Sequence, residues 1–377
     1  MKSNMQNYYP RFAVIGAGNG GQAMAAHLAI KGFTVNLYNR TIEKVAHIKQ
    51  KGFISLEGAI KGRGELNIVT DNMKDAIEDT DIIMVTVPAS GHRDIAVSCI
   101  PYLRDGQIIV LNPGRTGGAL EFFNILKSEG LDKKVVVAET QTFIYACRII
   151  DPGRVKIYSI KNQISLAALP AEETSRVIRI LSMAYPQFVP ASNVLETSLN
   201  NIGAVFHPAP TILNCGRIES TKGSFDYYTD GITPSVAKVI EEIDEERIRV
   251  AKALGVNTIT AQNWLELSYG SSGESLYEAI QNTAGYKGIK APPTMDVRYI
   301  FEDIPESLVP ISSMGSMLDI DTPTIDSIIQ LASTIHDVDY FKIGRNTINL
   351  GIEGLTVDQI TDLVNHGEVG ELEGVVA

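Results

Sequence analysis

The 377-residue sequence contains little cysteine, little tryptophan and no excess of basic charge. Its three cysteines, Cys99, Cys147 and Cys215, lie far apart and form no C-x-x-C pair. This pattern excludes a disulfide framework and a cysteine-based zinc site, and we expect no metal. The formal net charge of −11 argues against a nucleic acid or an anionic membrane as partner, because either would attract a basic face.

Long apolar runs are also missing. No uninterrupted stretch approaches the roughly 18 residues of a membrane span, and residues 1–10 lack the apolar core of a secretory leader. These features predict a soluble, cytoplasmic protein. Its length is sufficient for two domains. Because the overall charge is negative, any anionic ligand must be held by individually placed Arg or Lys side chains.

Glycine, in contrast, is concentrated at one turn near the start. The apolar segment Phe12–Ile15 leads into a glycine-rich hexapeptide, and an apolar helical stretch covers residues 22–30. The G-x-G-x-x-G spacing permits a tight turn, lets the backbone approach a pyrophosphate, and lets helix and strand pack closely. A strand before the loop and a helix after it favour dinucleotide binding over a simple turn. The cofactor-binding residues expected here are Gly16, Ala17, Gly18, Asn19, Gly20 and Gly21.

The end of the second expected strand, residues 34–38, indicates which dinucleotide binds. Asn39, Arg40 and Thr41 follow it, at the position where a free ribose 2′-hydroxyl usually meets Asp or Glu. A carboxylate would repel a 2′-phosphate, whereas guanidinium, hydroxyl and amide groups bind one. The sequence therefore favours NADP(H). NAD(H) stays open, because Arg40 could be a solvated loop charge.

Strand-like and helical segments alternate through the first half of the chain. Apolar runs at residues 81–87, 107–112 and 134–139 lack polar alternation, which is typical of a parallel sheet covered on both faces. After residues 186–190 helical patterns dominate, most clearly at residues 234–254, with the charged run 244–247 expected on the solvated face. We predict an α/β Rossmann-type parallel sheet domain, residues 1–188, followed by an all-α C-terminal domain, residues 189–377.

Ligands of open parallel sheets bind beyond the carboxyl ends of the strands. Pro88 and Asn112 follow two of these ends and are expected on the nicotinamide side of the cofactor. The alternative is that the prolines and glycines there serve turn geometry alone.

Two segments of the second half could carry acid–base chemistry. His207 lies in an apolar stretch that ends in two prolines, where a placed catalytic group and a satisfied core histidine are both consistent with the spacing. Arg298, Glu302 and Asp303 precede Pro305. Taken alone, they also read as a helix-capping cluster in which Arg298 pairs with Glu302.

In chain order, five segments together resemble motifs of the octopine/nopaline (opine) dehydrogenase family: Gly16–Gly21 and residues 112–121, 139–148, 201–208 and 298–305. The resemblance spans nearly the whole chain. It implies an NAD(P)H-dependent enzyme that joins the amine of an amino acid to the carbonyl of a 2-oxo acid and reduces the resulting imine. Pyruvate is the default oxo acid, with 2-oxoglutarate open, and the amino acid is not determined. A homodimer is our expectation.

The resemblance also implies roles for individual residues. His207 resembles the catalytic histidine of the family and Asp303 its carboxylate partner, since imidazole can shuttle protons and a carboxylate fixes its tautomer. Arg298 resembles the arginine that grips the oxo-acid carboxylate. Thr142 and Cys147 resemble substrate-pocket residues.

Two other functions share parts of this pattern. A related two-domain reductase, acting on glycerol phosphate, ketopantoate or a hydroxy acid, would have the same nucleotide-binding half but usually a lysine as general acid. A non-enzymatic NADP-binding protein would need only the first domain.

Overall fold

The computed structural model describes residues 9–370, which fall into two compact units. The first unit contains the described residues up to 114, residues 118–197 and those from 362 on; the second contains residues 115–117 and 198–361. The first unit therefore contains segments from before and after residue 188. The expected functional boundary between residues 1–188 and 189–377 stays a prediction. Residues 1–10, in which we expect no secretory leader, lie almost wholly outside the described residues.

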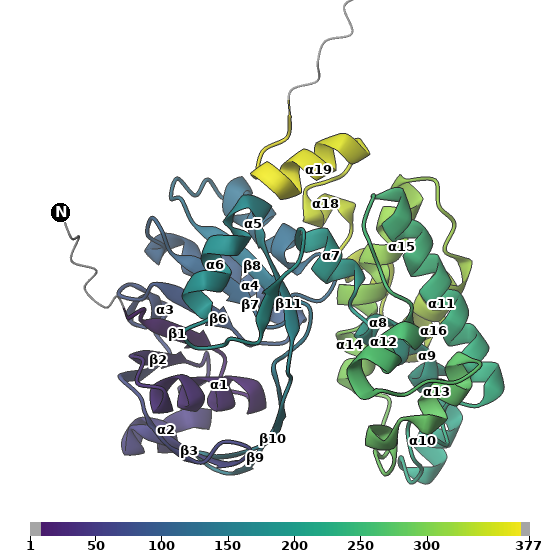
Figure 1. Cartoon of the computed structure of the whole chain (residues 1–377), viewed down its shortest axis with the longest axis horizontal. Coiled ribbons are helices and arrows are strands. Elements are labelled where there is room, and N and C mark those ends of the chain that lie inside the picture. The colour runs from purple at the N-terminus through teal and green to yellow at the C-terminus, as the bar shows by residue number, and fades with distance from the viewer. Residues whose placement is uncertain (1–8, 371–377) are drawn as a thin grey trace, which may run out of the picture. The chain divides into compact units, whose positions relative to one another are not determined.

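The core of the first unit, within the described residues, is an eight-stranded sheet in the order β12-β11-β8-β7-β6-β1-β2-β5 (Figure 1). Every residue of β1, β2, β6 and β7 is buried. This burial explains why β1, β6 and β7 read as unbroken apolar runs. Its strands are β1 (Phe12–Ile15), β2 (Val35–Tyr38), β5 (Ile68–Thr70), β6 (Ile82–Val85), β7 (Ile108–Leu111), β8 (Val136–Thr140), β11 (Ile164–Leu169) and β12 (Phe188–Pro190).

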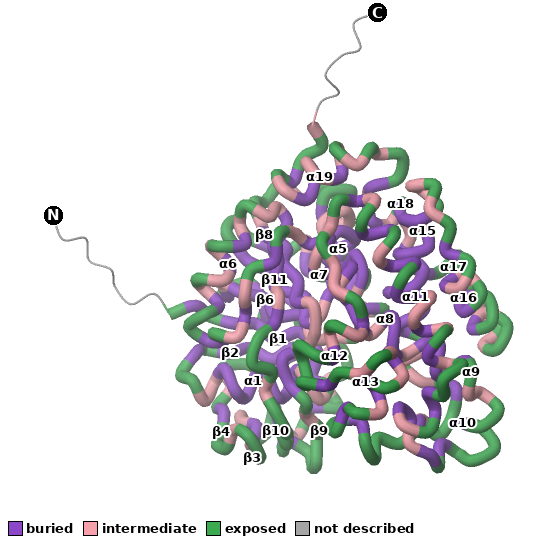
Figure 2. The backbone as a smooth tube through the Cα atoms, turned by 45° about the vertical axis from the view of Figure 1, so that its right-hand side comes forward, coloured by how far each residue is buried: buried purple, intermediate pink, exposed green. Residues whose placement is uncertain are grey.

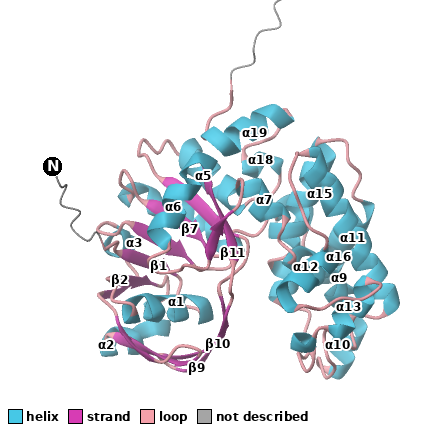
Figure 3. Cartoon of the chain, viewed as in Figure 1, coloured by secondary structure: helices cyan, strands magenta, loops and turns pink. Residues whose placement is uncertain are grey.

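The pairing in this sheet is parallel except between β8 and β11, which run antiparallel. The mostly parallel sheet confirms the expected fold class. Five helices pack on it and are labelled with it in Figure 3: α1 (Asn19–Ile30), α2 (Ala46–Lys51), α3 (Met73–Ile77), α5 (Gly118–Ser128) and α6 (Thr174–Leu181). Helix α4 (His92–Cys99) packs against α5 and α3. The tube in Figure 2 shows the central strands as continuously buried.

A second, four-stranded sheet in the first unit has the order β4-β3-β10-β9. It consists of β3 (Phe53–Gly58), β4 (Gly62–Glu65), β9 (Tyr145–Asp151) and β10 (Arg154–Ile160), and it packs against α1. β9 and β10 therefore belong to this separate sheet and not to the main one. Because α1 begins at the glycine loop, the small sheet supports the loop from the side opposite the main sheet's strands.

Within the described residues of the second unit, all regular secondary structure is helical, apart from one isolated bridge between Asp226 and Lys290. Two helices are shared with the first unit, α7 (Val194–Leu199) and α19 (Val357–His366). The others are α8 (Gly203–Phe206), α9 (Pro208–Leu213), α10 (Cys215–Thr221), α11 (Pro234–Ala253), α12 (Ala261–Tyr269), α13 (Leu276–Asn282), α14 (Arg298–Phe301), α15 (Val309–Met317), α16 (Pro323–His336), α17 (Tyr340–Ile343) and α18 (Thr347–Leu350). None of the described helices is both long and apolar enough to cross a bilayer.

Helix α11 confirms the expected helix but corrects the expected exposure of its charged run. Thr233 caps its start and Pro234 occupies its first position. Asp244, Glu246 and Arg247 are buried rather than solvated. Their charges are satisfied by neighbouring backbone: Arg247 donates to carbonyls outside α11, and Glu246 accepts from the first amides of α16. A charged run on a helix is buried when it completes the hydrogen bonds of other segments.

Candidate active site

The strand register of the first unit brings the expected cofactor residues to one edge of the sheet. Ile15 lies beside Tyr38 and Val85, and Val85 lies beside Leu111, at the carboxyl ends of four parallel strands. The glycine loop, the Asn39–Arg40–Thr41 segment, the turn at Pro88 and the Asn112 loop therefore all leave the same edge. This is the edge at which ligands of open parallel sheets bind.

The glycine loop fits a dinucleotide. A Cβ on Gly16 would approach Val87 Cγ1 to 2.7 Å, and one on Gly21 would lie 1.7 Å from the Gly16 carbonyl oxygen, so the protein itself requires these two glycines. A Cβ on Gly18 would meet nothing within 4 Å, and its φ of −72° suits any residue. The space over Gly18 is thus open for a ligand group such as a pyrophosphate.

Helix α1 adds an anion-binding feature to this loop. It begins at Asn19 with no side chain capping its first amides and no acidic residue in its first turn. Such a helix start attracts negative charge. Neighbouring segments hold the helix start in place: Asn19 Oδ1 accepts from Ile149 N of β9 at 2.8 Å, and Ala17 N donates to Asn39 Oδ1 at 3.2 Å.

In the segment after β2, Asn39 and Arg40 make different kinds of contact. Asn39 is committed to the backbone, since its Nδ2 also donates to the Thr41 carbonyl at 2.7 Å. Arg40 is 83% exposed and lies 3.5 Å from the exposed carboxylate of Asp94. An exposed ion pair of this kind contributes little, so the guanidinium can exchange Asp94 for another anion at small cost.

In the structure Pro88 and Asn112 shape the backbone of the loops in which they lie. Pro88 precedes a short 3-10 turn, Ala89–Gly91. Asn112 is buried, its Nδ2 donates to the Val110 carbonyl at 2.8 Å, and its peptide bond to Pro113 is cis. Their part in cofactor binding stays a prediction.

Thr142 and Cys147 lie after the carboxyl end of β8, in the first unit. Thr142 Oγ1 accepts a hydrogen bond from Lys161 Nζ at 2.6 Å. Cys147 Sγ lies 3.4 Å from the Asn19 carbonyl oxygen, so it touches the glycine loop directly. Burial raises the pKa of Cys147 to about 11, which keeps it a neutral thiol.

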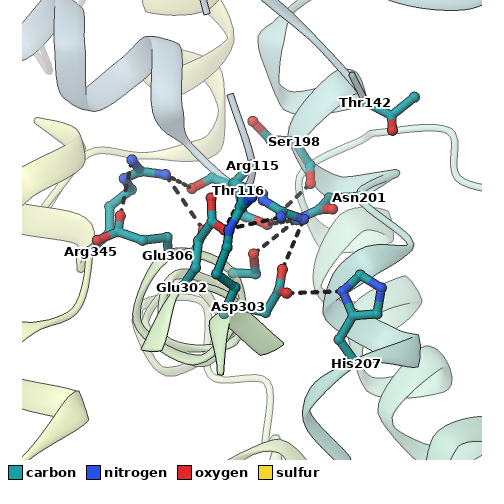
Figure 4. Close-up of polar contacts among 12 residues, drawn as sticks. Arg115, Thr116, Thr142, Ser198, Asn201, His207, Glu302, Asp303, Glu306 and Arg345 are labelled. Carbon is teal, nitrogen blue, oxygen red and sulfur yellow. Dashed lines mark hydrogen bonds and ion pairs between the residues drawn. The ribbon is translucent and has the colours of Figure 1, made fainter. Parts of the chain in front are cut away.

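His207 and Asp303 meet in the second unit although 96 residues separate them. His207 Nδ1 lies 2.9 Å from Asp303 Oδ2 (Figure 4). His207 occupies the break between α8 and α9, where its carbonyl accepts from Tyr227 Oη at 2.7 Å and its ring stacks on Tyr299 with centroids 4.3 Å apart. The Asp303 side chain, 1% exposed, follows α14 and precedes a π-helical turn, Ile304–Leu308.

This geometry defines the proton positions on His207. An ionised carboxylate can only accept hydrogen bonds, so Nδ1 carries a proton and faces Asp303. The second nitrogen, Nε2, is then the one that exchanges protons with a reacting group. The arrangement is that of a general acid–base imidazole oriented by a carboxylate.

Arg298 contacts Glu302. Its Nε donates to Glu302 Oε2 at 2.6 Å, and its side chain is 56% exposed. The pairing that the sequence offered as the alternative for this segment is therefore present. The exposed part of the guanidinium still has donors to spare, and its role toward a substrate carboxylate stays a prediction.

The sequence reasoning missed Arg115 and the residues that hold it. Arg115 Nη1 lies 2.9 Å from Asp303 Oδ1, and its Nη2 lies 3.4 Å from Glu302 Oε2. The next residue is held by buried partners, since Arg345 Nη1 donates to the Thr116 carbonyl at 2.8 Å and Asn201 binds Thr116 Oγ1 (Figure 4). The available signal was that Arg115 lies among the glycines of the segment 112–121, one of the five segments that resemble the family.

Two family models match successive parts of the chain. The family model described as NAD/NADP octopine/nopaline dehydrogenase, alpha-helical domain, matches residues 190–336. The model described as the NAD binding domain of 6-phosphogluconate dehydrogenase matches residues 11–113.

Whole-length relatives extend the similarity over both units. An opine dehydrogenase of Arthrobacter sp. (strain 1C) is 41% identical over 94% of this chain and 98% of its own. The protein ocs of Agrobacterium tumefaciens (strain Ach5) is 25% identical over 94% of this chain and 99% of its own. An octopine dehydrogenase solved with NADH and L-arginine has a TM-score of 0.79 and 21% identity, covering 97% of this chain and 100% of its own. The resemblance expected from the sequence is confirmed.

Proposed function

Because the chain belongs to the opine dehydrogenase family, we propose that it joins an amino acid to a 2-oxo acid and reduces the resulting imine, with NADPH as its preferred reductant. The observation that carries this proposal is the contact between His207 and Asp303. The family and the nucleotide-binding domain make it an NAD(P)-dependent oxidoreductase.

In the proposed reaction His207 manages the protons. Its Nε2 accepts a proton from the amino-acid ammonium, which frees the amine to attack the carbonyl carbon. The imidazolium then returns a proton to the carbinolamine hydroxyl, which leaves as water as the imine forms. Asp303 stabilises the imidazolium through Nδ1. When the water leaves, the nitrogen keeps its hydrogen, so the imine forms in its protonated (iminium) state. The reduced dinucleotide, when bound, supplies the hydride that converts this iminium to a neutral secondary amine.

The cofactor is proposed to lie over Gly18 with its pyrophosphate at the start of α1. Arg40 and Thr41 are proposed to bind the 2′-phosphate, supported by the exposure of Arg40 and by its weak present partner Asp94. Asn39 then acts by holding the loop, through its contacts to Ala17 and Thr41.

Arg298 is proposed to bind the carboxylate of the oxo acid, with Thr142 and Cys147 contributing to the substrate pocket. Solved octopine dehydrogenases are described with L-arginine and with pyruvate, which supports an amino acid and a 2-oxo acid as the substrate classes. We propose pyruvate as the oxo acid. The three free cysteines support a cytoplasmic location, and light scattering of the purified protein will test the expected homodimer.

A matrix of amino acids against 2-oxo acids, followed by loss of NADPH absorbance, tests the function. We expect oxidation only when both partners are present. Oxidation of NADPH with an oxo acid alone would indicate a keto-acid reductase. If no pair of amino acid and oxo acid leads to oxidation, the protein would be a non-enzymatic NADP-binding protein.

His207→Asn should bind NADPH normally and lose roughly a hundredfold or more in turnover. His366→Asn, which removes an exposed histidine paired with Glu172, is the matched control. Activity of His207→Asn within a few-fold of the wild type would refute the acid–base role.

A further inference from the structure

We infer that Arg115 is a positioning residue for the reaction: it binds the Asp303 oxygen that does not face His207 and thereby fixes the charge and orientation of the acid–base pair. The inference rests on the proposed roles of His207 and Asp303. It assigns a task to a residue of the segment 112–121 that the sequence analysis gave no role.

The carboxylate of Asp303 is held from two sides. Oδ2 faces His207 Nδ1 at 2.9 Å, and Oδ1 faces Arg115 Nη1 at 2.9 Å (Figure 4). With only 1% of its side chain exposed, Asp303 has almost no water to compensate its charge. A buried carboxylate stays ionised only if cations and donors replace that water. Arg115 supplies a permanent positive charge beside Asp303, because guanidinium does not deprotonate in proteins.

Arg115 is itself rigidly held. Its backbone has φ +62°, a left-handed conformation that is unusual for a residue with a side chain. The residues after it explain how this conformation is kept: Thr116 N donates to the Glu306 carbonyl at 3.1 Å, and Gly117 N donates to Ser198 Oγ at 2.9 Å. Arg345, which is fully buried, ties the Thr116 carbonyl to the Glu306 carboxylate. The guanidinium therefore reaches Asp303 from a fixed backbone.

Several other groups face the pair and contribute to its electrostatics. From α14 and its end come Arg298, Tyr299 and Glu302; from the other side come Thr211 and Tyr227. Glu302 binds both Arg115 and Arg298, so it links the two guanidinium groups. Burial alone lowers the pKa of Arg115, but Asp303 and Glu302 outweigh it and raise the pKa above the usual value.

Removing the Arg115 charge should make the pair bind a proton more readily. Arg115→Met leaves Asp303 and His207 without the cation that opposes protonation. The midpoint of the His207 titration should then rise by about one pH unit, the order expected for a unit charge within several ångströms. Arg115→Lys keeps the charge but loses the bridge to Glu302, so its titration should stay within about 0.3 pH unit of wild type.

His207 can be titrated by NMR on protein with isotope-labelled histidine, assigned with His207→Asn, in the absence of substrates. The midpoint is compared among wild type, Arg115→Met, Arg115→Lys and the control Arg249→Met. The control removes a half-exposed guanidinium of α11 from the same unit. If Arg115→Met does not fold, Arg115→Gln carries the same measurement, because its amide can still donate to Asp303. NADPH binding and circular dichroism check the fold of every variant.

Three results would overturn the inference. The first is a His207 midpoint in Arg115→Met that matches the control. The second is an equal rise in Arg115→Lys, because the effect would then not come from the cation that Arg115 supplies to Asp303. The third is an unmoved pH–kcat profile with a raised KM for the oxo acid, which would make Arg115 a substrate ligand. Because the titration needs no turnover, it stays decisive even if no amine and oxo acid pair is found active, which would count against the proposed function alone.

Discussion

The open space over Gly18 leads to a prediction that separates ligand binding from folding. Gly18→Ala adds a methyl group that meets no protein atom within 4 Å, on a backbone that alanine adopts freely. The unfolded chain loses some freedom, so the free energy of unfolding should be unchanged or rise by up to about 1 kcal/mol. If a dinucleotide pyrophosphate lies against Gly18, however, the methyl group occupies its place. Overpacking of this kind costs about 1–3 kcal/mol, which corresponds to a 5- to 150-fold rise in Kd.

Gly21→Ala is the matched control, with the opposite outcome. Its methyl carbon would lie 1.7 Å from the Gly16 carbonyl oxygen and 2.6 Å from Thr86 Oγ1, so the backbone must move. At a cost of about 3 kcal/mol, Tm should fall by roughly 6–12 °C.

Calorimetric titration with NADPH and differential scanning calorimetry on the same preparations measure both effects. We expect Gly18→Ala to melt like the wild type and bind weakly, and Gly21→Ala to melt early. Wild-type NADPH affinity in a normally folded Gly18→Ala would show that the cofactor does not approach this residue. The reasoning about the loop would then be wrong.

Three further predictions concern single side chains. Arg298→Ala should raise the KM for the 2-oxo acid by roughly 10- to 100-fold, because a charge-assisted contact is lost. If only the KM for the amino acid rises, Arg298 binds the amino acid and our assignment is wrong. Arg40→Ala should lower the preference for NADPH over NADH by about tenfold, and an unchanged ratio of their Michaelis constants would remove the NADP assignment. His27, hydrogen-bonded to Tyr145, has its pKa lowered from 6.5 to about 4 by burial and by Lys31. The native state then binds fewer protons than the unfolded state between these values, so stability should fall as pH decreases from 6.5 to 4, by at most about 3 kcal/mol. His27→Leu should remove this slope in urea unfolding, and an unchanged slope would show that His27 is not its source.

The main sheet was predictable because its strands follow a simple physical rule. Strands buried on both faces must be apolar at every position, and β1, β6 and β7 are. The glycine loop was predictable because two of its requirements are local: Gly16 has φ +102°, and a Cβ on Gly21 would meet the Gly16 carbonyl five residues earlier. Features fixed within about twenty residues are the ones that a single sequence reveals.

The small sheet shows where such reasoning fails. β3 and β4 form a hairpin with mixed burial, and β9 carries exposed residues along most of its length. Half-exposed strands of this kind lack the apolar run that marked the others. Their pairing also depends on partners distant in the chain, because β3 pairs with β10 about a hundred residues later. Cys147 lies in β9 and Thr142 lies three residues before this strand, so their surroundings could not be deduced from the sequence.

The candidate catalytic site was only partly predictable. The spacing left His207 and the Arg298–Asp303 segment ambiguous, and the family resemblance alone paired His207 with Asp303. Arg115 was missed because its carboxylate partners follow 187 and 188 residues later, inside a different unit from the loop that precedes it. Only the folded chain brings these groups together.

The charges of this cluster suggest how a chain with a net charge of −11 can use anionic substrates. Glu302 and Asp303 contribute two negative charges, and Arg115 and Arg298 contribute two positive charges. The cluster is therefore neutral while His207 is neutral, and it becomes positive when His207 takes up a proton. In the proposed mechanism that proton comes from the amino-acid ammonium and is later given to the departing hydroxyl. Attraction for the oxo-acid carboxylate is thus strongest in the protonation state that assists dehydration, so one proton on His207 serves both substrate binding and imine formation.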